Sequence, residues 1–109
     1  MENLLVVYIT CPSYEAAETL SRQLLEEKLA ACCNILQGVR SLFWWENKID
    51  EDEESLIIVK TQKTRLNELV EFVQEHHPYD VPEVIALPIV GGSQEYLDWV
   101  KQETTDEWK

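Results

Sequence analysis

Residues 30–45 read AACCNILQGVRSLFWW, and apolar side chains fall alternately on the two sides of this stretch. That alternation is the period of a β-strand, and Gly38 interrupts it in the middle. Because a glycine inside a strand is typical of a bulge, we predict one long strand that bends near Gly38. A polar turn over 46–52 and a β-branched strand over 56–59 follow. The stretch therefore predicts a long hairpin.

The segment before this hairpin predicts a strand followed by a helix. Residues 4–11 form a continuous apolar, β-branched run of strand length. Pro12 ends the run, and Ser13 is a suitable N-cap for a helix that continues to about Leu29. Its apolar positions recur at helical spacing, so we expect this helix to cover one face of a sheet.

The segment after the hairpin predicts a second helix, a fourth strand and a third helix. Thr64 can cap the second helix, and Pro78 ends it. Residues 84–90 read as the fourth strand, and Pro88 places it at a sheet edge because proline lacks a ladder donor. Ser93 can cap the third helix, which precedes a polar tail.

The predicted order is β-α-β-β-α-β with an additional C-terminal helix, in a single domain over residues 1–109. This order is the split βαβ pattern of the ferredoxin-like sandwich, an α+β fold. The long strand over 30–45 would form a sheet edge that is aromatic on both faces near Trp44 and Trp45. We therefore expect a symmetric homo-oligomer in which neighbouring copies pair edges and bury these tryptophans.

Composition limits the partners. The 109 residues include 9 Lys and Arg against 21 Asp and Glu, giving a net charge of −12 and a pI of about 4.4. Such a charge repels polyanions, so nucleic acid is not expected as a partner. No apolar run approaches the roughly 20 residues of a membrane span. Residues 1–9 lack a basic start and a cleavage site, so we expect a cytoplasmic protein with no membrane partner.

A set of short strings carries a family resemblance. They are CPS (11–13), KLAAC (28–32), FWWE (43–46), KT (60–61), HPYDVPE (77–83), ALPI (86–89) and YLDW (96–99). In this order and spacing, the chain resembles the CutA divalent-cation tolerance family. The resemblance implies a small, trimeric, ferredoxin-like protein of the cytosol, associated with tolerance of copper and other divalent metals. It also implies an architecture similar to PII-type signalling trimers and no established catalytic reaction.

The resemblance places metal-binding histidine just before the proline-tyrosine pair, at His76 and His77. The thiol that can accompany it in the family falls at Ile9 here, and Cys11 could take its place if the second helix ends nearby. Imidazole and thiolate suit copper, so we expect Cu²⁺ or another divalent cation to bind weakly through His76, His77 and Cys11. Two alternatives remain open: the histidines could interact only with the helix dipole, and the acidic run over 50–54 could hold the cation.

A second group of side chains could form a ligand cleft between copies of the chain. Two of its members, Tyr79 and Glu83, belong to a rigid loop shaped by two prolines. The other three lie elsewhere in the sequence and are Arg40, Trp45 and Lys60. A PII-like trimeric ligand sensor or signalling scaffold is therefore the alternative function. The sequence offers no nucleophile with a base and no phosphate-binding glycine loop, so we do not expect an enzyme.

Overall fold

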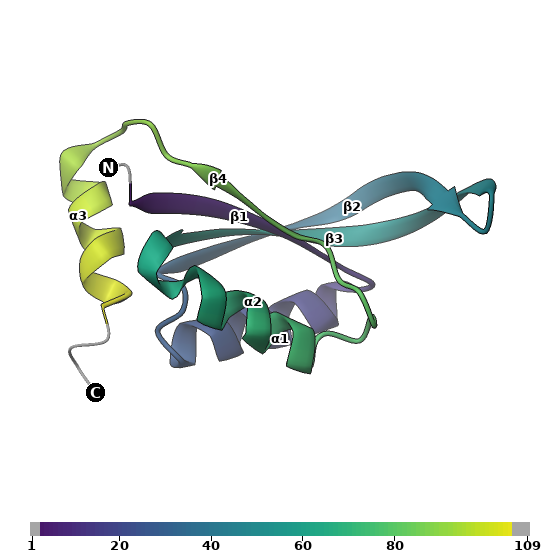
Figure 1. The fold of residues 1–109 in the computed structure, drawn as a ribbon, viewed down its shortest axis with the longest axis horizontal. Coiled ribbons are helices and arrows are strands. Elements are labelled where there is room, and N and C mark those ends of the chain that lie inside the picture. Colours follow the sequence, from purple (N-terminus) through teal and green to yellow (C-terminus); the bar gives the residue numbers. More distant parts are fainter. Residues whose placement is uncertain (1–2, 106–109) are drawn as a thin grey trace.

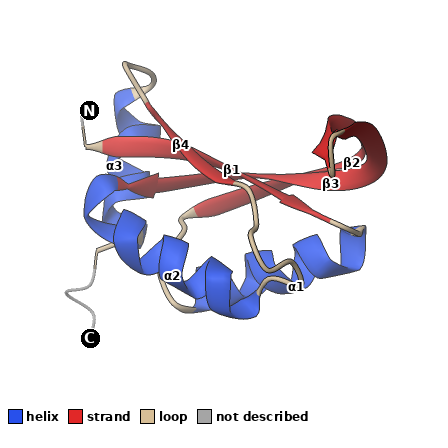
Figure 2. Cartoon of the chain, turned by 45° about the vertical axis from the view of Figure 1, so that its right-hand side comes forward, coloured by secondary structure: helices blue, strands red, loops and turns tan. Residues whose placement is uncertain are grey.

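The computed structural model describes residues 3–105, which contain four strands, three α-helices and one 3₁₀ turn. In chain order these are β1 (Leu4–Cys11), α1 (Tyr14–Glu26), β2 (Cys32–Trp45), β3 (Lys48–Gln62), η1 (Lys63–Arg65), α2 (Leu66–His76), β4 (Val84–Pro88) and α3 (Gln94–Glu103). The strands form one antiparallel sheet in the order β2-β3-β1-β4. Helices α1 and α2 cover one face of it (Figure 1 and Figure 2). The predicted ferredoxin-like α+β fold with a C-terminal helix is confirmed.

The main core lies between the sheet and the two covering helices. Alternate residues of β1 and β3 point into it and meet the apolar stripes of α1 and α2, as expected from periods of 2 and 3.6. Its fully buried members include Val7, Ile9, Ile57, Val59, Leu24 and Leu69. Cys33 packs against this core, whereas its neighbour Cys32 points to the other face of the strand.

Helix α1 begins as predicted and ends earlier. The Ser13 side chain accepts a hydrogen bond from the Ala16 N–H at 3.1 Å, which is the predicted N-cap. The helix stops at Glu26 because Lys28 takes a left-handed φ of 59°, and the Leu29 N–H bonds back to the Leu24 carbonyl. The prediction of a helix to about Leu29 was therefore too long.

Beyond the sheet, β2 and β3 continue as a two-stranded arm, defined here as residues 39–54 (Figure 1). The predicted bulge lies at its base, where the register shifts between Leu36 and Val39 and Gly38 has a φ of 72°. The arm turns at Glu46 and Asn47, which both have positive φ, as in a two-residue type I′ hairpin turn. The prediction of a turn over 46–52 was wrong. The tight turn lets β3 start at Lys48, and the acidic run lies on this strand, where residues 50–53 are exposed.

The second half of the chain differs from the predictions at two boundaries. Thr64 lies inside η1 and does not cap α2, which starts at Leu66 without a capping side chain. Helix α2 does end before Pro78 as predicted, because His77 is extended with ψ of 143°. Strand β4 ends at Pro88, not at residue 90, and pairs only with β1, which confirms its edge position.

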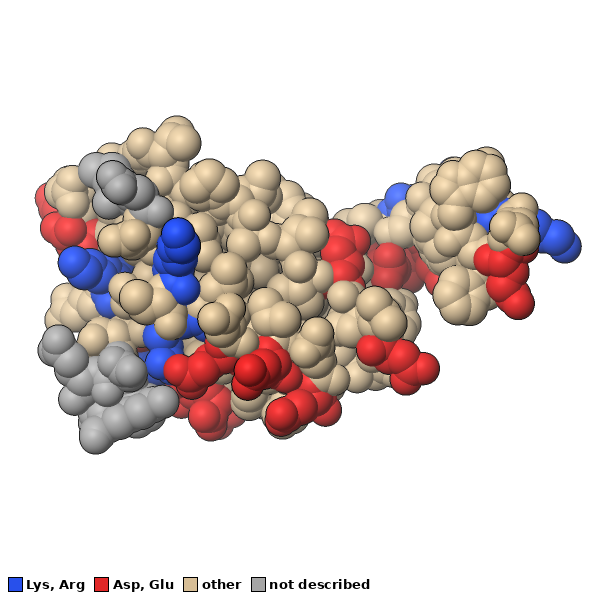
Figure 3. Space-filling view, in the orientation of Figure 1, with Lys and Arg blue, Asp and Glu red and all other residues tan. Residues whose placement is uncertain are grey.

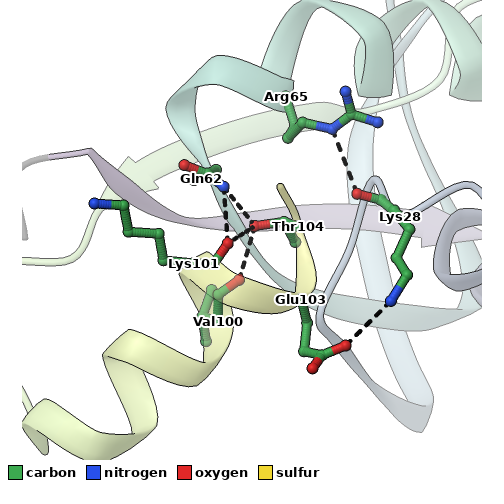
Figure 4. Close-up of polar contacts among 7 residues, drawn as sticks. All are labelled: Lys28, Gln62, Arg65, Val100, Lys101, Glu103 and Thr104. Carbon is green, nitrogen blue, oxygen red and sulfur yellow. Dashed lines mark hydrogen bonds and ion pairs between the residues drawn. The ribbon is translucent and has the colours of Figure 1, made fainter. Parts of the chain in front are cut away.

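Helix α3 lies at the opposite end of the sheet from the arm (Figure 1) and is joined to the body by polar contacts (Figure 4). The Gln62 amide donates to the Lys101 carbonyl at 3.1 Å and to Thr104 Oγ1 at 3.0 Å. The guanidinium of buried Arg65 donates to the backbone carbonyls that end α1. Side chains at the β3–α2 junction therefore satisfy the C-terminal carbonyls of both α1 and α3. Ser93 caps α3, as predicted.

Candidate functional site

The loop after α2 is fixed to the end of β1 by His77. The His77 side chain is 7% exposed, and its Nε2 donates to the Thr10 carbonyl at 2.7 Å. Its Nδ1 accepts the Tyr79 backbone N–H at 3.0 Å. A carbonyl can only accept and an amide N–H can only donate, so these two bonds define a neutral ring with its hydrogen on Nε2. Both ring nitrogens of His77 are therefore already used within the chain.

His76 differs from its neighbour because it is exposed and uses only one ring nitrogen. Its Nδ1 donates to the Phe72 carbonyl at 2.8 Å, one helical turn earlier. The ring also stacks on Phe72, with centroids 3.9 Å apart and planes 13° apart. The carbonyl places the hydrogen on Nδ1, which leaves the lone pair on Nε2. Of the predicted pair, His76 is the one with a nitrogen free to accept a ligand.

Cys11 belongs to a buried group at the junction of the body and the arm. The Tyr79 hydroxyl donates to Glu54 Oε2 at 3.0 Å, and Glu54 is 8% exposed. Burial, and secondly the charge of Glu54, raises the pKa of the Cys11 thiol to about 11. Burial, the Glu54 hydrogen bond and nearby carboxylates raise the pKa of Tyr79 to about 12. Both groups are protonated at neutral pH, and a protonated thiol is not a good metal ligand.

The structure brings two of the three predicted metal ligands to one end of the sheet. His77 bonds to Thr10, the neighbour of Cys11 in β1, whereas His76 faces solvent. Within residues 3–105, no three His, Cys, Asp or Glu side chains converge to hold an ion. The three residues thus do not form one open coordination site in a single chain.

The predicted cleft residues lie apart within one chain. Arg40 pairs with Glu51 on the arm at 2.7 Å, and Trp45 is exposed near the arm's turn. Lys60 bonds to Asn34 in the body. Along β3, Lys60 is about 20 Å from Glu54, the partner of Tyr79, because a strand rises roughly 3.3 Å per residue. Glu83 is exposed. Any cleft that uses all five residues must therefore include a second chain.

A shallow hollow of about 470 Å³ lies at the base of the arm, lined by Gly38, Arg40, Glu51, Asp52 and Glu53. Figure 3 shows acidic side chains gathered along the helix layer and on the arm, with basic side chains at the α3 end and also on the arm. This distribution attracts cations and repels polyanions. In the part of the chain that the structure describes, no helix is long and apolar enough to cross a bilayer.

Two groups that hold the loop after α2, Glu54 and the Thr10 carbonyl, could not be identified from the sequence. Glu54 looks like one more member of an exposed acidic run, and its burial depends on Tyr79 arriving from a distant loop. The Thr10 carbonyl is backbone and has no residue signature.

The order of strands and helices, with the long arm and the C-terminal helix, places the chain structurally among the ferredoxin-like α+β proteins. The sequence model of the CutA1 divalent ion tolerance protein matches residues 5–103. The chain therefore belongs to the CutA family, and the resemblance noted from its motifs is confirmed. The family is non-catalytic, in agreement with the expectation that the protein is not an enzyme.

Several relatives and solved structures are similar over most of the chain. The divalent-cation tolerance protein CutA of Thermus thermophilus is 48% identical over 91% of the chain and 96% of its own length. The chloroplastic CutA 1 of Oryza sativa is 50% identical over 94% of the chain, which spans only 58% of that relative. The crystal structure of CutA1 from Oryza sativa superposes with a TM-score of 0.93 at 48% identity, covering 96% of both chains. The Thermus structure gives 0.92 at 47% identity, covering 94% of this chain and 99% of the other.

Proposed function

We propose that the protein works as a homotrimer that binds divalent cations weakly and prefers copper. The observation that carries the assembly is the apolar surface of the arm. Leu42, Trp44, Trp45 and Ile49 are 62%, 74%, 61% and 66% exposed. Leu42, Trp44 and Ile49 share one face of the arm and Trp45 lies on the other. Monomeric proteins rarely leave so many large apolar side chains together in water, because each loses its hydrophobic stabilisation. A second copy of the chain is the partner that would cover them.

The sheet edges support the same proposal. Within residues 3–105, β2 pairs only with β3, and β4 pairs only with β1. Their outer backbone groups can therefore pair with other copies. Closed cyclic symmetry would place each arm on a neighbouring copy and leave no arm uncovered. The number three follows from the resemblance to the CutA family.

His76 supports the cation part of the proposal. A metal-binding histidine commonly donates its other ring N–H to a carbonyl, which fixes the tautomer and aims the lone pair. His76 has this arrangement through the Phe72 carbonyl. Imidazole favours copper over magnesium, so we propose His76 Nε2 as the first ligand. His77 and Cys11 stay predicted ligands that would have to release their present contacts, and the acidic run over 50–54 is the competing locus.

Light scattering tests the assembly. We expect a mass three times the 12.7 kDa of the chain. Trp44→Ser or Trp45→Ser should lower that mass, because the interface loses an aromatic anchor. The matched control is Asp50→Asn with Glu51→Gln, which changes solvated carboxylates on the same arm and should keep the trimer. A wild-type monomer, or equal losses from both variants, would contradict the proposal.

Copper calorimetry tests the ligand. His76→Ala should abolish the copper isotherm, whereas neutralising Asp50, Glu51, Asp52 and Glu53 should preserve it, and wild type should bind Mg²⁺ more weakly than Cu²⁺. Affinity should fall as the solution is made more acidic, because protons compete with the metal for the imidazole lone pair. His77→Ala is the comparison and should weaken copper binding less than His76→Ala, because both ring nitrogens of His77 are already bonded within the chain. Copper binding that survives His76→Ala but is lost on neutralising the acids would move the site to the arm.

The cytoplasmic location stays a proposal. The names of the rice and Arabidopsis relatives place those proteins in chloroplasts, and one similar structure, from Archaeoglobus fulgidus, is named periplasmic. Fluorescence microscopy of the tagged full-length natural protein would test it. A signal confined to an organelle or the periplasm would contradict it.

A further inference from the structure

The bulge at Gly38 is an extra residue in β2 that β3 does not match. Leu36 pairs with Leu56, and the next pair joins Val39 to Glu54, so β2 uses one residue more than β3 between the two pairs. Gly38 takes a φ of 72°, in the left-handed region that favours glycine. An added Cβ would meet no atom within 4 Å. The glycine is needed for its backbone conformation and not for space.

The bulge is not needed to set the register of the hairpin. If Gly38 were absent, Gln37 would face Ser55, and the pairs on both sides would keep their present partners. The two-residue turn between Trp45 and Lys48 would also be unchanged. What the extra residue adds is a bend of the strand and a stronger local twist.

The position of the bulge gives that bend a consequence. Cys11, the last residue of β1, pairs with Ser55, so the sheet loses its third strand at the level where β2 is bulged. Beyond that level only two strands continue, and Figure 2 shows them curling away from the body sheet. A bend at this point sets the direction of the whole arm relative to the body.

Apart from the contact of Tyr79 with Glu54 at its base, the arm is not held in this direction by packing within the described chain. From residue 39 to residue 53 the side chains are exposed or half-buried, and only Glu54 at the base is buried. A bulge leaves a residue unpaired in the ladder, which is a loss of stability for the single chain. A feature that costs stability and is not used within the chain is expected to serve contacts outside it.

We propose that the Gly38 bulge aims the arm, so that its apolar side chains meet their contact surface on a second copy of the chain. This inference rests on the proposed homotrimer and adds the residue that directs each arm onto the neighbouring copy. Bending at one glycine rotates every side chain beyond it as one body. A small change at the base therefore moves Trp44 and Ile49, near the arm's turn, farther than the residues at the base of the arm.

Deletion of Gly38 separates aiming from folding. Backbone NOEs between Leu36 and Leu56 and between Ser41 and Asp52 report the ladder on either side of the bulge. We expect the deletion variant to keep both sets of NOEs and to lose the trimer mass in light scattering. Retention of both the NOEs and the wild-type mass would overturn the proposal. A wild-type monomer would instead overturn the proposed function, so the two failures are distinguishable.

Two substitutions decide the matter if the deletion variant does not fold. Asparagine tolerates the left-handed region, whereas β-branched valine does not. Gly38→Asn should therefore keep the trimer and Gly38→Val should lose it, and equal masses for the two would overturn the proposal. Gly91→Ala is the matched control, because Gly91 lacks a positive φ and an added Cβ there meets nothing within 4 Å. It should leave the mass unchanged.

Discussion

Strand β3 passes through the body and the arm, and an isoleucine in the body is buried whereas an isoleucine on the arm is exposed. Ile57, in the body, is fully buried between the sheet and the helices. Ile49, on the arm, is 66% exposed. The strand is continuous and both residues pair with β2, at Ile35 and Trp44. The difference is that β1 and the helix layer cover only the first. Apolar side chains therefore stabilise the single chain in the body and remain available to another molecule on the arm.

The largest expected effect comes from the same substitution at these two positions. Ile57→Ala should lower the free energy of unfolding by about 2–5 kcal/mol, because it leaves a cavity in a packed core. Ile49→Ala leaves no such cavity and should act only through association, so its effect should depend on protein concentration. Urea denaturation at several protein concentrations measures both. Equal, concentration-independent losses would remove the distinction between body and arm.

Two arginines give a smaller contrast. Arg65 is 2% exposed and donates to the Glu27 and Lys28 carbonyls, so Arg65→Ala should cost about 1–3 kcal/mol by leaving two partly buried carbonyls without this donor. The ion pair of Arg40 with Glu51 is mostly solvated, and Arg40→Ala should cost at most about 1 kcal/mol. Thermal unfolding at low and high salt checks both. A larger loss for Arg40→Ala would mean that the arm has structural contacts beyond those described.

The smallest expected effect concerns alkaline pH at the junction of body and arm. The pKa of Tyr79 rises from 10.0 to about 12 on folding, so the folded state keeps its proton longer than the unfolded state. This contribution to stability is complete below about pH 10 and is lost as the pH rises toward about 12. Tyr79→Phe should therefore flatten the fall of unfolding free energy above about pH 10. Tyr14→Phe, on an exposed tyrosine of α1, is the control and should leave the slope unchanged.

The sequence predicted the body better than the arm for a physical reason. In the body, burial makes the strand and helix periods visible, and the bounds of β1 were predicted to the residue. On the arm both faces meet water, so the acidic residues after the turn carried no apolar alternation and were interpreted as a loop. The Gly38 bulge was predictable because a glycine inside a strand usually marks a bulge. The left-handed backbone of Lys28, which ends α1, was not predictable, because lysine has no preference for that conformation.

The sequence suggested candidate site residues, but it could not predict how they are arranged. Adjacent histidines before Pro78 suggested two ligands, and the sequence does not indicate that one ring is fixed by Thr10 and Tyr79. The partners of these rings are backbone groups, which leave no residue signature. The separation of Lys60 from Tyr79 likewise depends on strand order, which the motif spacing does not contain.

Helix α3 has a small apolar cluster of its own, separate from the main core. Leu97 and Val100 pack there with Leu4, and Ala31 and Ile89 border them. Because the two clusters are separate, they are expected to open separately, so amide hydrogens of α3 should exchange through local openings that leave the main core closed. Such an opening would uncover the start of β1 and the end of β3, far from the arm. The two ends of the sheet can thus respond to different events without the whole chain unfolding.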